Sequence, residues 1–150
     1  MAGGLLHCMD EAAFLQTHID QHGFLSFLGL TVEDLEPGRL RLRVPYDEKL
    51  TNTGPGANGQ VHGGVAATIA DTAGGLAVRS TLDEPTQTGV ATIDLNISYL
   101  RPAAGDLVCT ANVVRTGSTV GVAEMTIESE TPDGKLKEVA VGRGSFRIFD

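Results

Sequence analysis

The segment from Val61 to Val78 constrains the fold of this chain more than any other part of the sequence. It is apolar and as long as a helix, and its only ionisable side chains are His62 at its start and Asp71 in its middle. A carboxylate in a mostly apolar helix costs on the order of several kcal/mol if it is dry and unpaired, so Asp71 is expected to have a partner or a task. A helix this apolar also needs cover, which predicts a sheet wrapped around it.

Gly63 and Gly64 open this predicted helix, and their distance from Asp71 limits how a site can be built. A helix rises about 1.5 Å per residue, so the eight steps from Gly63 to Asp71 span about 12 Å. A carbonyl held by N–H groups at the Gly63 end is therefore too far from Asp71 of the same helix for direct attack. We expect the two to meet across subunits, because mostly small residues flank the acid and allow close approach. At 100° per residue the Asp71 side carries Gly64, Ala67, Thr68, Gly75 and Val78.

The remainder of the chain reads mostly as strands. Apolar residues alternate with polar ones, and turn residues such as Pro and Gly separate the runs. The predicted strands are Thr31–Leu35, Arg39–Val44, Thr92–Tyr99, Leu107–Val114, Val120–Glu128 and Glu138–Phe149. We expect the first two to form a hairpin and the last four a meander, with Ile93, Leu95, Ile97 and Tyr99 on one side of their strand.

Two other segments complete the prediction. Residues 10–21 suggest a short amphipathic helix with Ala13, Phe14 and Ile19 facing inward and Leu15 as a further candidate, and Gly23 ends it. Residues 24–30 suggest a turn, and the glycine-rich stretch 50–59 a loop that leads into the long helix. The length of 150 residues fits one domain, residues 1–150, with a helical N-terminal segment at 1–27.

Charge and composition exclude several classes of function. The net charge is −8, from 11 Lys and Arg against 19 Asp and Glu, which argues against a nucleic-acid partner because phosphate backbones need a basic surface. The first seven residues lack the pattern of a signal peptide, and no segment is long and apolar enough to span a membrane. We therefore expect a cytoplasmic protein without a membrane partner. Cys8 and Cys109 are not expected to pair, and no histidine has metal-ligand company, so no metal is predicted.

Three elements of the sequence resemble the hotdog-fold thioesterase superfamily, and specifically its PaaI-like branch from the phenylacetate pathway. These are Val61–Gly64 at the start of the helix, Asp71 nine residues after His62, and the strand segment Asp94–Pro102. The resemblance covers roughly residues 28–149. It implies an α+β hotdog fold, in which a curved antiparallel sheet wraps around a long central helix. It also implies an acyl-CoA substrate, two sites per homodimer, and often a homotetramer. No cofactor is implied, because coenzyme A is part of the substrate.

The resemblance also implies catalytic roles. The backbone N–H of Gly63, aided by the helix dipole, would polarise the thioester carbonyl, with Gly64 beside it in the substrate site. Asp71 of the other subunit would act as general base on water or as nucleophile. Thr92 aligns with a residue that supports the water. We expect His62 to order the loop before the helix, with proton transfer as its alternative role.

The resemblance leaves two sets of contacts open. Family members commonly carry an Asn or Gln six residues before the histidine, where this chain has Gly56. Asn58 is favoured over Asn52 as the replacement. Arg101 and Arg115 lie just past strand ends, where relatives contact coenzyme A phosphates, and Ser118 follows in the same turn.

Three other functions remain possible from the sequence. A non-catalytic acyl-CoA-binding or sensing module would keep the Gly63 helix terminus and the arginines but make little use of Asp71. A hydratase or dehydratase of the same fold would use a paired Asp and His on a helix-opening loop, which this chain does not match. A purely structural dimer is the third. The acyl group, aryl or straight-chain, cannot be read from the sequence.

Overall fold

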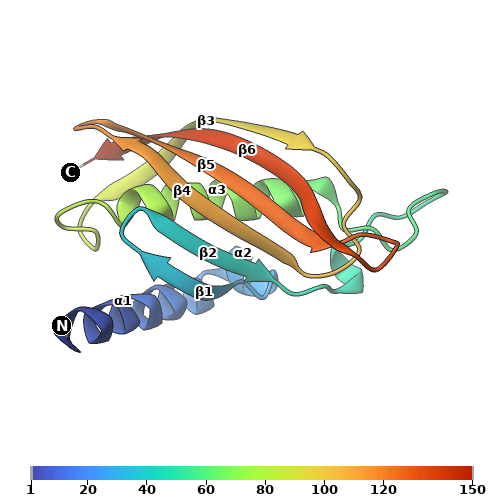
Figure 1. The fold of residues 1–150 in the computed structure, drawn as a ribbon, viewed down its shortest axis with the longest axis horizontal. Helices are drawn as coiled ribbons and strands as arrows, with labels where there is room; N and C mark the ends of the chain where they lie inside the picture. Colours follow the sequence, from blue (N-terminus) through green and yellow to red (C-terminus); the bar gives the residue numbers. More distant parts are fainter. Residues whose placement is uncertain (1, 150) are drawn as a thin grey trace.

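The computed structural model describes the backbone of residues 2–149 and the side chains of residues 11–149. A six-stranded antiparallel sheet curves around helix α3 (Gly63–Arg79), which lies along its concave side (Figure 1). The strand order is β1-β2-β4-β5-β6-β3. The strands are β1 (Thr31–Glu36), β2 (Arg39–Val44), β3 (Gly89–Tyr99), β4 (Leu107–Thr116), β5 (Val120–Glu130) and β6 (Leu136–Phe149), and the shorter elements are α1 (Ala2–Gln21), α2 (Gly23–Phe27) and the 3-10 turn η1 (Glu48–Leu50). The α+β fold predicted from the sequence is confirmed.

Helix α3 packs closely on the sheet, as its apolar sequence predicts. Val65, Ile69 and Ala73 are buried in the core. A Cβ added at Gly74 would lie 2.7 Å from Phe146 Cζ, so the helix can approach this closely only because position 74 has no side chain. Val78 was expected on the Asp71 side but is fully buried, because the sheet also covers this last turn of the helix.

The predicted hairpin of β1 and β2 is confirmed, whereas the predicted four-strand meander is only partly correct. Strands β4, β5 and β6 are consecutive neighbours, but β3 pairs with β6 and β4 pairs with β2. Because α3 crosses the concave face before β3 begins, β3 lies at the edge of the sheet opposite β1. The next strand, β4, then pairs with the β1–β2 hairpin. Local alternation identifies strands but not their neighbours.

The N-terminal helices differ from their prediction. Helix α1 begins at Ala2, well before residue 10, and residues 23–27 form the short helix α2 where a turn was expected. Ile19 is buried and Leu15 packs partly against the core, but Ala13 and Phe14 are exposed. Within residues 2–149, no helix is long and apolar enough to cross a membrane.

Strand β3 carries a β-bulge at Ile93. Its register with β6 shifts between Thr92 and Asp94, so Ile93 is an extra residue and is 55% exposed. Beyond the bulge, Leu95 and Ile97 pack against the core as predicted. A bulge adds one residue to the period-two pattern, and Thr92 consequently faces the same side as Leu95. The outer edge of β3 has no strand beside it among the described residues.

Substituting Gly142 in β6 is expected to destabilise the sheet where it holds β3. A Cβ at this position would lie 2.6 Å from the backbone oxygen of Asn96 in β3. We expect Gly142→Ala to lower the free energy of unfolding by about 1–3 kcal/mol, the usual cost of overpacking. Chemical denaturation measures it, with Gly23→Ala as control because a Cβ at Gly23 would meet nothing within 4 Å. Equal stability of the two variants would show that β3 moves aside at no cost.

Candidate active site

The first turn of α3 is capped by the residue that precedes it. His62 caps the helix: its Nδ1 accepts from the N–H of Gly64 at 2.8 Å, and its carbonyl accepts from Val65 at 3.0 Å. The N–H of Gly63 has no hydrogen-bond partner among the described residues. Of the two glycines, Gly63 is therefore the one whose N–H can bind a substrate oxygen, because the cap occupies that of Gly64.

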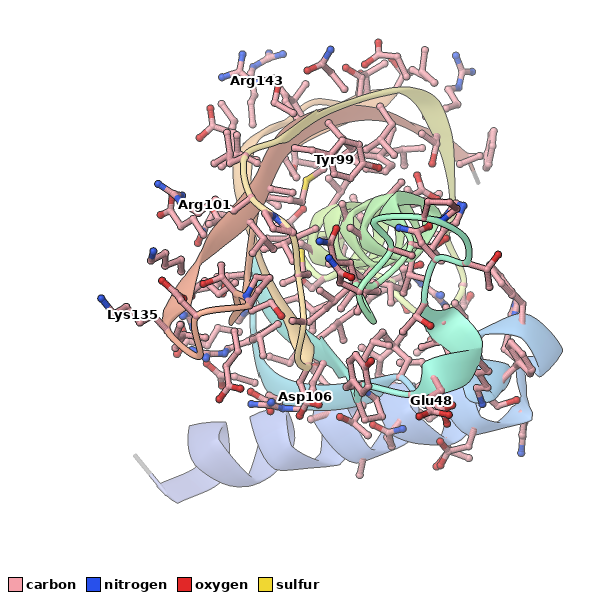
Figure 2. All side chains as sticks on the ribbon, turned by 90° about the vertical axis from the view of Figure 1, so that its right-hand side faces the viewer. Glu48, Tyr99, Arg101, Asp106, Lys135 and Arg143 are labelled. Carbon is pink, nitrogen blue, oxygen red and sulfur yellow. The ribbon has the colours of Figure 1, made fainter. Side chains whose placement is uncertain are left out.

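Tyr99 holds this first turn from the sheet side. Its hydroxyl donates to the carbonyl oxygen of Gly63 at 2.6 Å, and a Cβ on Gly63 would lie 3.2 Å from the tyrosine ring. Figure 2 looks onto this end of the molecule, where Tyr99 lies beside α3. No role in the site was predicted for Tyr99 from the sequence. Its one signal was its position at the end of an alternating strand.

A cavity of about 440 Å³ opens beside Gly63. His62, Gln60, Tyr99 and Arg101 are among its lining residues. Arg101 is exposed, and its Nη1 donates to the backbone oxygen of Glu138 at 2.8 Å. A cation therefore stands at the mouth of the cavity that contains the free Gly63 N–H.

The loop before α3 contributes a polar side chain to this cavity, and that side chain belongs to neither Asn58 nor Asn52. Thr51 and Val61 form a β-bridge, and the N–H of Asn52 donates to the carbonyl of Gln60 at 2.9 Å. Residues 53–59 therefore form an excursion that extends away from the sheet (Figure 1). Asn58, the favoured residue, lies exposed in this excursion with φ at 47° and does not line the cavity. Gln60 lines it.

Asp71 lies in a second cavity of about 440 Å³ on the exposed side of α3. Its carboxylate Oδ1 accepts a hydrogen bond of 2.5 Å from the hydroxyl of Thr92, so these two predicted residues are adjacent. Leu25, Leu95 and Thr72 also line this cavity. Gly63 does not line this second cavity, and Asp71 does not line the cavity beside Gly63. Within one chain the two proposed catalytic groups are thus kept apart, as the helix length predicts.

Arg115 and Ser118 lie at the other end of the molecule. The neighbouring Thr116 shares a 2.7 Å hydroxyl contact with Thr81, just past the C-terminal end of α3. Both predicted coenzyme A contacts are exposed there. Within one chain, Arg115 and Ser118 therefore do not lie near Arg101. Of these three residues, only Arg101 borders the Gly63 cavity.

Comparison with known proteins agrees with this architecture. Residues 58–135 match the model of the family described as the thioesterase superfamily. A Halobacterium salinarum protein named as a candidate esterase is 63% identical over 142 residues, covering 93% of both chains. Human acyl-coenzyme A thioesterase 13 is 33% identical over 116 residues, covering 76% of both.

Solved structures show the same fold. A thioesterase family protein from Silicibacter pomeroyi superimposes with a TM-score of 0.79 at 28% identity, covering 89% of this chain and 93% of the other. The Escherichia coli PaaI protein superimposes with a TM-score of 0.74 at 22% identity, covering 93% and 95%. At such identity and coverage, this chain belongs to the thioesterase superfamily, and its class of activity is thioester hydrolysis.

Proposed function

We propose that the protein hydrolyses acyl-CoA thioesters to a free acid and coenzyme A, at a site that two subunits form together. One observation carries the shared site: the free Gly63 N–H and the Thr92-bonded Asp71 carboxylate line separate cavities of one chain. The acyl-CoA thioesterase name of the human relative supports the substrate class. The working unit is a homodimer in the cytoplasm, and two such dimers associate as a tetramer.

In this mechanism the thioester carbonyl oxygen binds the Gly63 N–H of one subunit. The partial positive charge of the α3 N-terminus stabilises the oxyanion that develops there. Asp71 of the second subunit removes a proton from the attacking water, or attacks the carbonyl itself to form an anhydride that water then hydrolyses. Coenzyme A leaves as its thiolate on either route, and the Thr92 hydroxyl orients the carboxylate. The coenzyme A thiolate is a good leaving group, so the reaction needs no resident metal or redox cofactor. Arg101 binds a phosphate of coenzyme A at the cavity mouth.

Release of free thiol from acyl-CoA tests the activity. Burial raises the pKa of Cys109 to about 12, so its thiol will not react with the detection reagent at neutral pH. The side chain of Cys8 lies outside the described residues, and a Cys8→Ser background removes it from the assay. Binding of acyl-CoA without any thiol release would favour the non-catalytic binding module.

Mixing two inactive variants tests whether subunits share the site. Asp71→Asn subunits are exchanged with Gly63→Pro subunits. If the sites are shared, each mixed dimer has two of them: one site carries both substitutions, and the other carries neither. We expect the mixture to regain about a quarter of wild-type activity, because random exchange makes half of the dimers mixed and each has one intact site. A mixture as inactive as its parents would place each complete site within one chain.

A further inference from the structure

Tyr99, the last residue of β3, connects the sheet to the turn of α3 that presents the Gly63 N–H. Its hydroxyl donates to the carbonyl oxygen of Gly63 at 2.6 Å, and its ring lies 3.2 Å from the place of a Cβ on Gly63. We propose that Tyr99 is a positioning residue for thioester hydrolysis, which keeps the Gly63 N–H directed at the oxyanion. Tyr99 thus acts on the reaction through Gly63, and this role rests on the proposed function.

A glycine at position 63 does not by itself fix the direction of its N–H. Glycine has no Cβ and therefore the widest range of φ and ψ, and the first N–H groups of a helix have no intrahelical acceptor. An oxyanion donor stabilises the transition state most when it is already directed at the developing charge before the reaction. Contacts from outside Gly63 must therefore supply the order that its own backbone lacks.

Hydrogen bonds hold the peptide groups on both sides of Gly63. On the N-terminal side, the N–H of His62 donates to the carbonyl of Leu50 at 2.8 Å, and the carbonyl of His62 accepts from Val65 at 3.0 Å. On the C-terminal side, the carbonyl of Gly63 accepts from the Tyr99 hydroxyl. With both peptide groups held, the N–H of Gly63 keeps one direction. Loss of the hydroxyl leaves only the helix itself to hold the second group.

The backbone of Tyr99 is anchored in the sheet, while its side chain contributes little to the core. Tyr99 pairs with Ala140 of β6, and the next N–H, that of Leu100, donates to the carbonyl of Val139 at 2.8 Å. Tyr99 is 56% exposed and lines the cavity beside Gly63. An exposed aromatic residue buries little apolar area. Its contact with Gly63 therefore matters more for the geometry of the site than for the stability of the fold.

Tyr99→Phe removes the hydroxyl and keeps the ring. We expect kcat to fall about 5- to 10-fold, as for the loss of one neutral hydrogen bond, with little change in KM or unfolding temperature. The substrate is octanoyl- or phenylacetyl-CoA, whichever wild type hydrolyses faster. Tyr46→Phe is the matched control, because the Tyr46 hydroxyl also donates to a glycine carbonyl, that of Gly59, at 2.8 Å, and Tyr46 does not line the Gly63 cavity. It should change kcat by less than about 2-fold.

A double-mutant cycle separates a role through the Gly63 N–H from a role in the fold. In a Gly63→Pro background, where that N–H is absent, Tyr99→Phe should lower kcat by less than about 2-fold. In a Gly63→Ala background, which adds a Cβ at the same place but keeps the N–H, the loss of about 5- to 10-fold should remain. Losses of equal size in both backgrounds would overturn the role proposed for Tyr99.

Binding of inert analogues tests the same role without the proline variant. Trifluoroacetonyl-CoA carries a ketone whose hydrate imitates the tetrahedral oxyanion, and trifluoropropyl-CoA is the same ligand without that oxygen. We expect Tyr99→Phe to weaken binding of the ketone several-fold and to leave binding of trifluoropropyl-CoA unchanged. An equal effect on both ligands overturns the role of Tyr99 alone. Absence of thiol release by wild type from every acyl-CoA overturns the proposed function and the role of Tyr99 together.

Discussion

Asp71→Asn is expected to lower kcat for thioester hydrolysis by about 100-fold or more, the usual contribution of a general base. The amide oxygen of asparagine can still accept the hydrogen bond that Thr92 donates to Asp71 Oδ1 at 2.5 Å. The substitution therefore removes the negative charge and the proton acceptor with little change in shape. KM for acyl-CoA should change far less than kcat, because the role proposed for Asp71 is toward the water or the thioester carbonyl and not toward coenzyme A.

Steady-state thiol release and thermal unfolding of the same samples measure this effect. Asp20→Asn is the matched control, because Asp20 is an exposed helix aspartate that accepts a hydrogen bond from Gln16 at 2.8 Å. An amide at that position keeps the same contact. Wild-type turnover by a folded Asp71→Asn protein would show that another group drives the reaction.

Gly63→Pro is expected to lower kcat by about 100- to 1,000-fold, the usual cost of losing one oxyanion donor. Proline lacks the N–H but suits the first position of a helix, where that N–H makes no intrahelical bond. The preceding residue, His62, has φ −59° and ψ 134°, which is the conformation favoured before proline. The helix should therefore still form.

Gly63→Ala is the control that separates the donor from the packing. Both substitutions add a Cβ about 3.2 Å from the Tyr99 ring, so both disturb this contact to a similar extent. Only alanine keeps the N–H. We expect Gly63→Ala to retain most of the turnover at a similar unfolding temperature. Equal losses in both variants would assign the effect to Tyr99 and the space around it, and not to the backbone donor.

Structural features that depend on the local sequence pattern could be predicted from the sequence. The apolar run from Val61 to Val78 has no other way to bury its surface, so the central helix and the curved sheet follow from it. The β1–β2 hairpin follows from alternation around a proline-glycine turn. Once both residues are placed in one helix, the separation of Asp71 from Gly63 follows from helix geometry alone.

Features that depend on distant pairings could not be predicted. The bulge at Ile93 can be recognised only when the pairing of β3 with β6 is known. It changes which face of the sheet the residues before it point to, relative to the residues after it. Six residues before His62 the chain has Gly56, and the sequence favours Asn58 as its replacement because local pattern does not reveal the bridge between Thr51 and Val61. That bridge closes the excursion and places Gln60, not Asn58, at the cavity.

Among residues 2–149, no strand pairs with the outer side of the eleven-residue strand β3, so the backbone donors and acceptors that point outward there are open. Such an edge is a template for another strand, and β3 also holds Thr92 and Tyr99. Pairing of two copies along it would follow mass action, so the specific activity of a shared-site enzyme would fall when the protein is diluted below the dissociation constant of the dimer. Cellular abundance would then set the activity of each molecule as well as the total number of molecules.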